Sequence, residues 1–166
     1  MDAITALMTR RSVRKYKPDP IKPEDLATIL DCGRYAPSAT NSQGWRFVVI
    51  TDADLRQKIA QWMPYGKHLA QAPASIVVLT SDEGTYGPHE DAPAATMCMM
   101  LAAHALGYGT CWIACYDNPA YQQIAKELGA PEGWTMMTLF TLGVPDGEPR
   151  SAAKKTLEEV VSYNGF

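Results

Sequence analysis

Apolar residues recur at helical spacing in four stretches of the chain. The spacing predicts helices over residues 2–9, 23–36, 53–63 and 121–128. Pro23 suits the first turn of the second helix, Pro37 ends it, and Asp52 is the expected N-cap of the third. These helices therefore have both the periodicity and the end signals that stable helices need.

Runs of consecutive apolar residues predict four strands. They cover residues 46–50, 75–80, 110–114 and part of 134–144. The second run has four aliphatic residues in succession, which is typical of a strand buried on both faces. Helices and strands mixed in this way predict a layered α+β or α/β domain, and no repeat or composition change divides residues 1–166. We therefore expect one domain.

Residues 91–106 form a different kind of helix, apolar on almost every side, with the glycines of Gly107-Tyr108-Gly109 at its end. Such a helix has to be covered all round. A chain of 166 residues has enough apolar surface for one core but few elements to surround this helix. Two explanations stay open: an interface between subunits, or a fully buried central helix.

Composition and charge limit the kinds of partner and site that we expect. The formal net charge is −3, which gives no reason to expect nucleic acid or an acidic membrane as a partner. The four cysteines lack CxxC spacing and the three histidines are scattered, so we expect free thiols and no metal site. The longest apolar run, 92–106, is too short to span a bilayer. Without a recognisable signal peptide, the expected location is the cytoplasm.

Basic residues crowd one short segment. Five of the 15 lysines and arginines fall between Arg10 and Lys17. Arg10, Ser12 and Arg14 alternate, so an extended backbone would direct all three to one side. Guanidinium groups and a hydroxyl on one side suit a phosphate monoester. The alternative is an ordinary solvated turn.

Three further segments are candidates for binding. The loop 37–45 offers the amide groups of Asn41 and Gln43 to the edge of a polar ring, unless it is a simple capping loop. The run 107–114 delivers an apolar strand end that could wall a pocket, although core packing also explains it. Residues 150–155 are a second basic cluster, or else a solvated tail.

In order along the chain, these segments resemble the nitroreductase family of FMN-dependent oxidoreductases. The matching motifs are Arg10-Arg11-Ser12-Val13-Arg14, Ala36-Pro37-Ser38-Ala39-Thr40-Asn41-Ser42-Gln43-Gly44-Trp45, Leu101 to Ile113, and Leu157-Glu158-Glu159-Val160-Val161. Gly44 departs from the pattern, because the family usually has proline there. The change could loosen the loop but removes no ligand group.

The resemblance implies roles for individual residues. Arg10 and Ser12 would bind the FMN phosphate, with Arg11 on the ribityl and phosphate side. Arg14 would approach the N1–C2 edge of the flavin ring, where a cation stabilises the reduced cofactor. The other implied FMN contacts are Pro37, Ser38, Asn41 and Gln43 of the loop, Ile113 and Ala114 near flavin N5, and Lys154, with Lys155 as second choice, closing the phosphate site.

The resemblance also implies a fold and an activity. The fold would be a three-layer α+β sandwich, with a mixed, mainly antiparallel sheet between helices. Two chains would form an intertwined homodimer with FMN at the interface. NADH or NADPH would reduce the flavin, which would then reduce a nitroaromatic, a quinone or a similar small acceptor by ping-pong hydride transfer, so no catalytic side chain is required. The alternative is a protein that stores or senses flavin without efficient turnover.

Overall fold

A computed structural model describes residues 1–81, 83, 87–113 and 118–166. An antiparallel four-stranded sheet with the order β1-β2-β4-β3 lies at its centre. The strands are β1 (Trp45–Ile50), β2 (Ala74–Ser81), β3 (Gly109–Trp112) and β4 (Trp134–Gly143). The four predicted strands are thereby confirmed, with ends that differ by one or two residues.

Both faces of the sheet are buried. On β2, Ile76 and Val78 pack into one apolar core, and the alternate residues Val77 and Leu79 pack into a second core behind the sheet. Side chains alternate between the two faces of a strand, so a strand between two cores needs apolar residues in succession. The run of aliphatic residues in β2 follows from this position.

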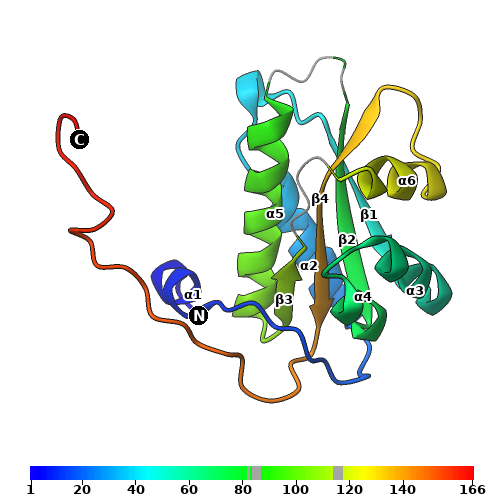
Figure 1. The fold of residues 1–166 in the computed structure, drawn as a ribbon, viewed down its shortest axis with the longest axis horizontal. Helices are drawn as coiled ribbons and strands as arrows, with labels where there is room; N and C mark the ends of the chain where they lie inside the picture. Colours follow the sequence, from blue (N-terminus) through cyan, green and yellow to red (C-terminus); the bar gives the residue numbers. More distant parts are fainter. Residues whose placement is uncertain (82, 84–86, 114–117) are drawn as a thin grey trace.

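Helices cover both faces of the sheet and complete three layers (Figure 1). The first face carries α2 (Pro23–Arg34) and α5 (Pro88–Ala105). The opposite face carries α3 (Ala53–Trp62), α4 (Lys67–Gln71) and α6 (Ala120–Glu127). The predicted α+β sandwich is confirmed. The helix α4 was not predicted, because five residues are too few to display a helical period.

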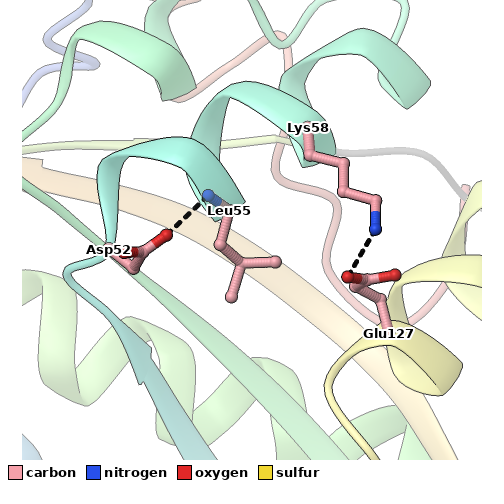
Figure 2. A network of polar contacts seen from close by, with 4 residues as sticks. All are labelled: Asp52, Leu55, Lys58 and Glu127. Atoms are coloured by element: carbon pink, nitrogen blue, oxygen red, sulfur yellow. Dashed lines mark hydrogen bonds and ion pairs between the residues drawn. The ribbon is translucent and has the colours of Figure 1, made fainter.

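Local polar contacts fix the outer layer (Figure 2). The Asp52 carboxylate accepts a hydrogen bond from the Leu55 amide at 2.7 Å, which is the predicted N-cap of α3. Lys58 of α3 and Glu127 of α6 form an ion pair at 2.6 Å. Both side chains of the pair are partly exposed, so it contributes little beyond alignment of the two helices.

The basic segment after α1 (Ala3–Thr9) lies against the sheet as an irregular extra strand. The Val13 amide donates to the Thr110 carbonyl at 2.9 Å, and Ser12 pairs with Thr110 in parallel. Further along, the Lys17 amide donates to the Val144 carbonyl at 2.9 Å. The parallel contact is one isolated bridge beside four strands that all pair antiparallel, so the mainly antiparallel sheet that the resemblance implied is confirmed.

The apolar helix α5 is buried on one side only. Ala95, Met99 and Ala103 are fully buried against the sheet and α2. The residues on its other side are apolar but partly exposed, namely Ala94, Met97, Cys98, Leu101 and Ala102. The explanation by a fully buried central helix is therefore wrong for the single chain.

The C-terminal segment leaves the body of the molecule. Residues 151–166 are all exposed, and most of this segment extends away from the sheet and its helices (Figure 1). Five of them are large apolar residues, namely Leu157, Val160, Val161, Tyr163 and Phe166. Exposed apolar groups in this number are typical of an interaction surface. Of the helices in the described ranges, none has the length and apolar character to cross a membrane.

Candidate functional site

The sheet and one tyrosine hold the basic segment in place. The Tyr16 hydroxyl donates to the Val13 carbonyl at 2.5 Å and lies 2.6 Å from the Thr141 hydroxyl on β4. Burial raises the pKa of Tyr16, with a smaller opposing effect from the bond to Thr141, so the phenol stays protonated and keeps donating. Gly109 adds close contact: a Cβ at this position would lie 2.7 Å from the Cβ of Val13.

The thiol of Cys111 on β3 is buried, and Arg10, Ser12 and Arg14 all influence its pKa. Burial raises the pKa of this thiol, and Arg14, a hydrogen bond to Ser12, and Arg10 oppose that rise. Ser12 and Arg14 also line a cleft of about 380 Å³, together with Arg150. The hydroxyl and two guanidinium groups at this cleft are donors that suit a phosphate monoester. The carboxylates of Asp146 and Glu148 line the same cleft and leave less net positive charge for an anion.

Arg11 and His68 make or lack contacts that no sequence pattern indicates. The Arg11 guanidinium folds back on α1 and donates to the Met8 and Arg10 carbonyls, both at 2.8 Å. His68 of α4, one of the three scattered histidines, is buried, and its Nε2 has no hydrogen-bond partner among the described residues. Burial lowers the pKa of His68, and the charge of Arg14 lowers it further.

The loop between α2 and β1 has a strained backbone. Thr40, Asn41 and Gln43 have φ values of 53°, 58° and 49°, in the left-handed region that side chains other than glycine rarely adopt. Each such residue costs about 1–2 kcal/mol, so the surrounding contacts must hold the loop. The backbone N–H of Gln43 donates to the Ser38 hydroxyl at 3.0 Å, and the backbone N–H of Ala39 donates to the Asp91 carboxylate at 3.2 Å.

This loop opens onto its own cleft. Pro37 and Ser38 line a volume of about 470 Å³ together with Glu90 and Asp91 from the first turn of α5. Asn41 and Gln43 are exposed beside it. Strained backbone and exposed amides at a cleft are features of binding loops, whereas a simple capping loop needs neither.

The loop and the basic segment lie at opposite ends of α5. Asp91, at the start of the helix, binds the loop, and His104, in its last turn, lies 2.8 Å from Thr9 beside the basic segment. These residues are 13 positions apart, which is about 20 Å along an α-helix. The chain therefore places the segment with Arg10, Ser12 and Arg14 at one end of α5 and the loop with Pro37, Ser38, Asn41 and Gln43 at the other.

The other residues that the resemblance implies as FMN contacts differ in burial and in distance along the chain from the two clefts. The Ile113 side chain is buried in the second core, with 2% exposed, and its amide donates to the Leu139 carbonyl at 2.8 Å. Ala114 lies outside the described residues. Lys154 and Lys155 are exposed on the C-terminal segment. Arg150, from the same basic cluster, lines the cleft with Ser12, and no sequence pattern distinguishes it from the two lysines.

The described residues contain no group of three or more histidine, cysteine or acidic side chains that could hold a metal ion.

A comparison with protein-family models matches the nitroreductase family over residues 7–64 and 60–144. The chain belongs to the nitroreductase family. The resemblance inferred from the motifs is confirmed.

Individual nitroreductase relatives agree over nearly the full length. A protein of Archaeoglobus fulgidus described as an NADH dehydrogenase/NAD(P)H nitroreductase is 34% identical over 152 residues, covering 89% of this chain and 87% of the relative. The FMN-dependent nitroreductase of Clostridium difficile is 30% identical, with a TM-score of 0.91 and coverage of 98% and 99%. A Desulfovibrio desulfuricans protein described as a nitroreductase, solved in complex with FMN, is 30% identical, with a TM-score of 0.89 and coverage of 100% and 98%.

Proposed function

We propose that this nitroreductase-family chain is an FMN-dependent oxidoreductase that uses NADH or NADPH to reduce small acceptors such as nitroaromatics or quinones. The observation that carries the proposal is the clamp of Arg10, Ser12 and Arg14 on a segment fixed by the sheet and Tyr16. FMN complexes and NAD(P)H-dependent activities named among its relatives support the choice of cofactor and reductant.

The donor set at the clamp fits the cofactor. Arg10 and Ser12 would hold the phosphate, and Arg150 or the more distant Lys154 and Lys155 would close that end from the C-terminal side. Arg14 would place its positive charge toward the ring. The cleft of about 380 Å³ lies within the usual range of about 300–1,000 Å³ for small-molecule sites.

FMN, when bound, would supply the two-electron chemistry by exchanging a hydride between nicotinamide and acceptor. The chain's own residues would bind, orient and polarise. A fixed cation at Arg14 favours the anionic reduced form of the ring. Asn41 and Gln43 would donate amide hydrogen bonds to a ring edge, from a loop whose geometry is set before binding. This division of work needs no protein nucleophile or metal.

We infer further that each site is shared by two chains. The loop and the clamp are about 20 Å apart along α5, so one chain offers only half of the contacts to any one cofactor. A twofold dimer that packs α5 against its copy in antiparallel orientation would bring the loop of one chain to the clamp of the other. Such packing would also cover Met97 and Leu101 and give the apolar C-terminal segment a surface.

The test has two stages. The purified protein should be yellow with bound FMN, and NADH or NADPH should bleach that colour under anaerobic conditions. A panel of nitroaromatic, quinone and enone acceptors should then restore it at rates that support turnover. Flavin that neither nucleotide reduces would contradict the enzyme and favour the storage protein, and a chain without affinity for FMN would contradict both.

A further inference from the structure

One hydrogen bond joins the end of α1 to the last turn of α5. The Thr9 hydroxyl lies 2.6 Å from the Thr5 carbonyl and 2.8 Å from Nε2 of His104. A carbonyl oxygen only accepts, so the single hydroxyl hydrogen goes to Thr5, and Nε2–H of His104 must donate to Thr9. The imidazole is thereby fixed with its hydrogen on Nε2, and Nδ1 is the atom that binds a second proton.

The charges around His104 come from the basic segment. Arg10 and Arg11 directly follow Thr9, and α1 itself has no charged side chain. Burial lowers the pKa of His104, and Arg10 and then Arg11 lower it further. Among the described residues these are the charged groups that act on it, because Glu90 and Asp91 lie at the other end of α5. The end of a helix otherwise favours a cationic histidine, so the arginines are what oppose protonation.

The geometry points to His104 as a proton-linked member of the phosphate site. A phosphate monoester at Arg10 and Ser12 carries up to two negative charges and would offset the repulsion from the arginines. His104 would then take up a proton on Nδ1 while its Nε2–H bond to Thr9 stays unchanged. This inference rests on the proposed function, because it requires the anion at that clamp. His104 acts through Thr9 and the local field, as a positioning residue.

The sign of the pH dependence follows from the two states. Without the phosphate the pKa of His104 is lowered, and a bound phosphate would raise it, so protonated His104 strengthens binding as the pH falls below neutrality. A partly exposed ion pair is worth about two- to fivefold in affinity. The phosphate itself takes up a proton near pH 6, which weakens binding in every variant. The ratio of two variants removes that common effect.

The experiment compares the wild-type chain with His104→Gln, whose amide donates from about the position of Nε2 but carries no charge. FMN dissociation constants are measured at about pH 8 and pH 5.5, and riboflavin, which lacks the phosphate, is the matched ligand. We expect the variant to bind FMN as the wild type does at pH 8 and about two- to fivefold more weakly at pH 5.5. Riboflavin binding should show no such difference.

A constant FMN ratio across this pH range would overturn the inference, and so would an equal change with riboflavin, which would mean a structural role. If the wild-type chain bound no FMN, the proposed function would fail together with the inference. A second measurement uses the wild-type chain alone. The pKa of His104, followed by NMR titration of its imidazole resonances, should be higher with FMN than without it. An unchanged or lower pKa would overturn the inference even if the variant failed to fold.

Discussion

The substitution Gly109→Ala tests whether close packing on the sheet positions the basic segment. A Cβ at residue 109 would lie 2.7 Å from Cβ and Cγ2 of Val13 and 2.8 Å from its Cγ1. Carbon atoms in ordinary contact are about 3.5–4.0 Å apart, so the two residues would have to separate by about 1 Å. Val13 cannot relieve this by rotation, because its Cβ is itself too close. The segment that carries Ser12 and Arg14 would have to move.

The size of the effect follows from that movement. Overpacking of this kind costs about 1–3 kcal/mol, which lowers the melting temperature by about 2–12 °C for a chain of this length. The segment is tied by the bonds from Val13 to Thr110 and from Tyr16 to Val13, so it cannot shift freely. If the displacement reaches the clamp in full, FMN affinity falls by about 5- to 150-fold.

The assay is FMN binding followed by flavin fluorescence, paired with thermal unfolding. Gly107→Ala is the matched control, because Gly107 has a φ of 90° and a Cβ there would meet nothing within 4 Å. Its left-handed backbone costs about 1–2 kcal/mol with alanine, so this variant should lose stability but keep FMN affinity. Unchanged FMN affinity in Gly109→Ala, or an equal loss in both variants, would refute the reasoning.

Two further predictions concern the residues that hold the framework. Tyr16→Phe removes the hydroxyl between Val13 and Thr141 and should lower the free energy of unfolding by about 1–3 kcal/mol in urea titrations. Because burial raises the pKa of Tyr16, this stabilisation should be complete below about pH 10 and decline as the pH rises further. Asp52→Ala removes the N-cap of α3 and should cost about 0.5–2 kcal/mol, whereas Glu127→Gln, which removes the partner of Lys58, should cost less than about 1 kcal/mol. Equal losses in these last two variants would contradict the assigned roles.

Much of the fold could be predicted because its signals are local. The aliphatic run of β2 and the N-cap Asp52 each act within a few residues, so the chain itself displays them. The helix α4 is too short for a period and depends on burial of Leu69, which is a tertiary effect. The start of α5 also differs from the prediction, because Pro88 begins the helix three residues before the predicted start.

The candidate site was predicted less completely, for a different reason. Alternation of Arg10, Ser12 and Arg14 is a sequence property, and in the structure all three influence the pKa of the Cys111 thiol. His104 and Thr9 are 95 positions apart in the sequence, and no local pattern predicts the hydrogen bond between them. The folding back of Arg11 onto α1 likewise depends on where the helix ends. Contacts of this kind arise only when distant segments pack.

The shared site is the central claim, and its most direct test is subunit complementation. Homodimers of Arg10→Ala/Ser12→Ala and of Asn41→Ala/Gln43→Ala should each lose most of their FMN, because each lesion damages both sites. A heterodimer of the two variants would have both lesions in one site and an intact second site. We predict that it binds one FMN per dimer with wild-type affinity. A heterodimer with no high-affinity FMN would mean that the loop and the clamp of the same chain form the site, which contradicts the account.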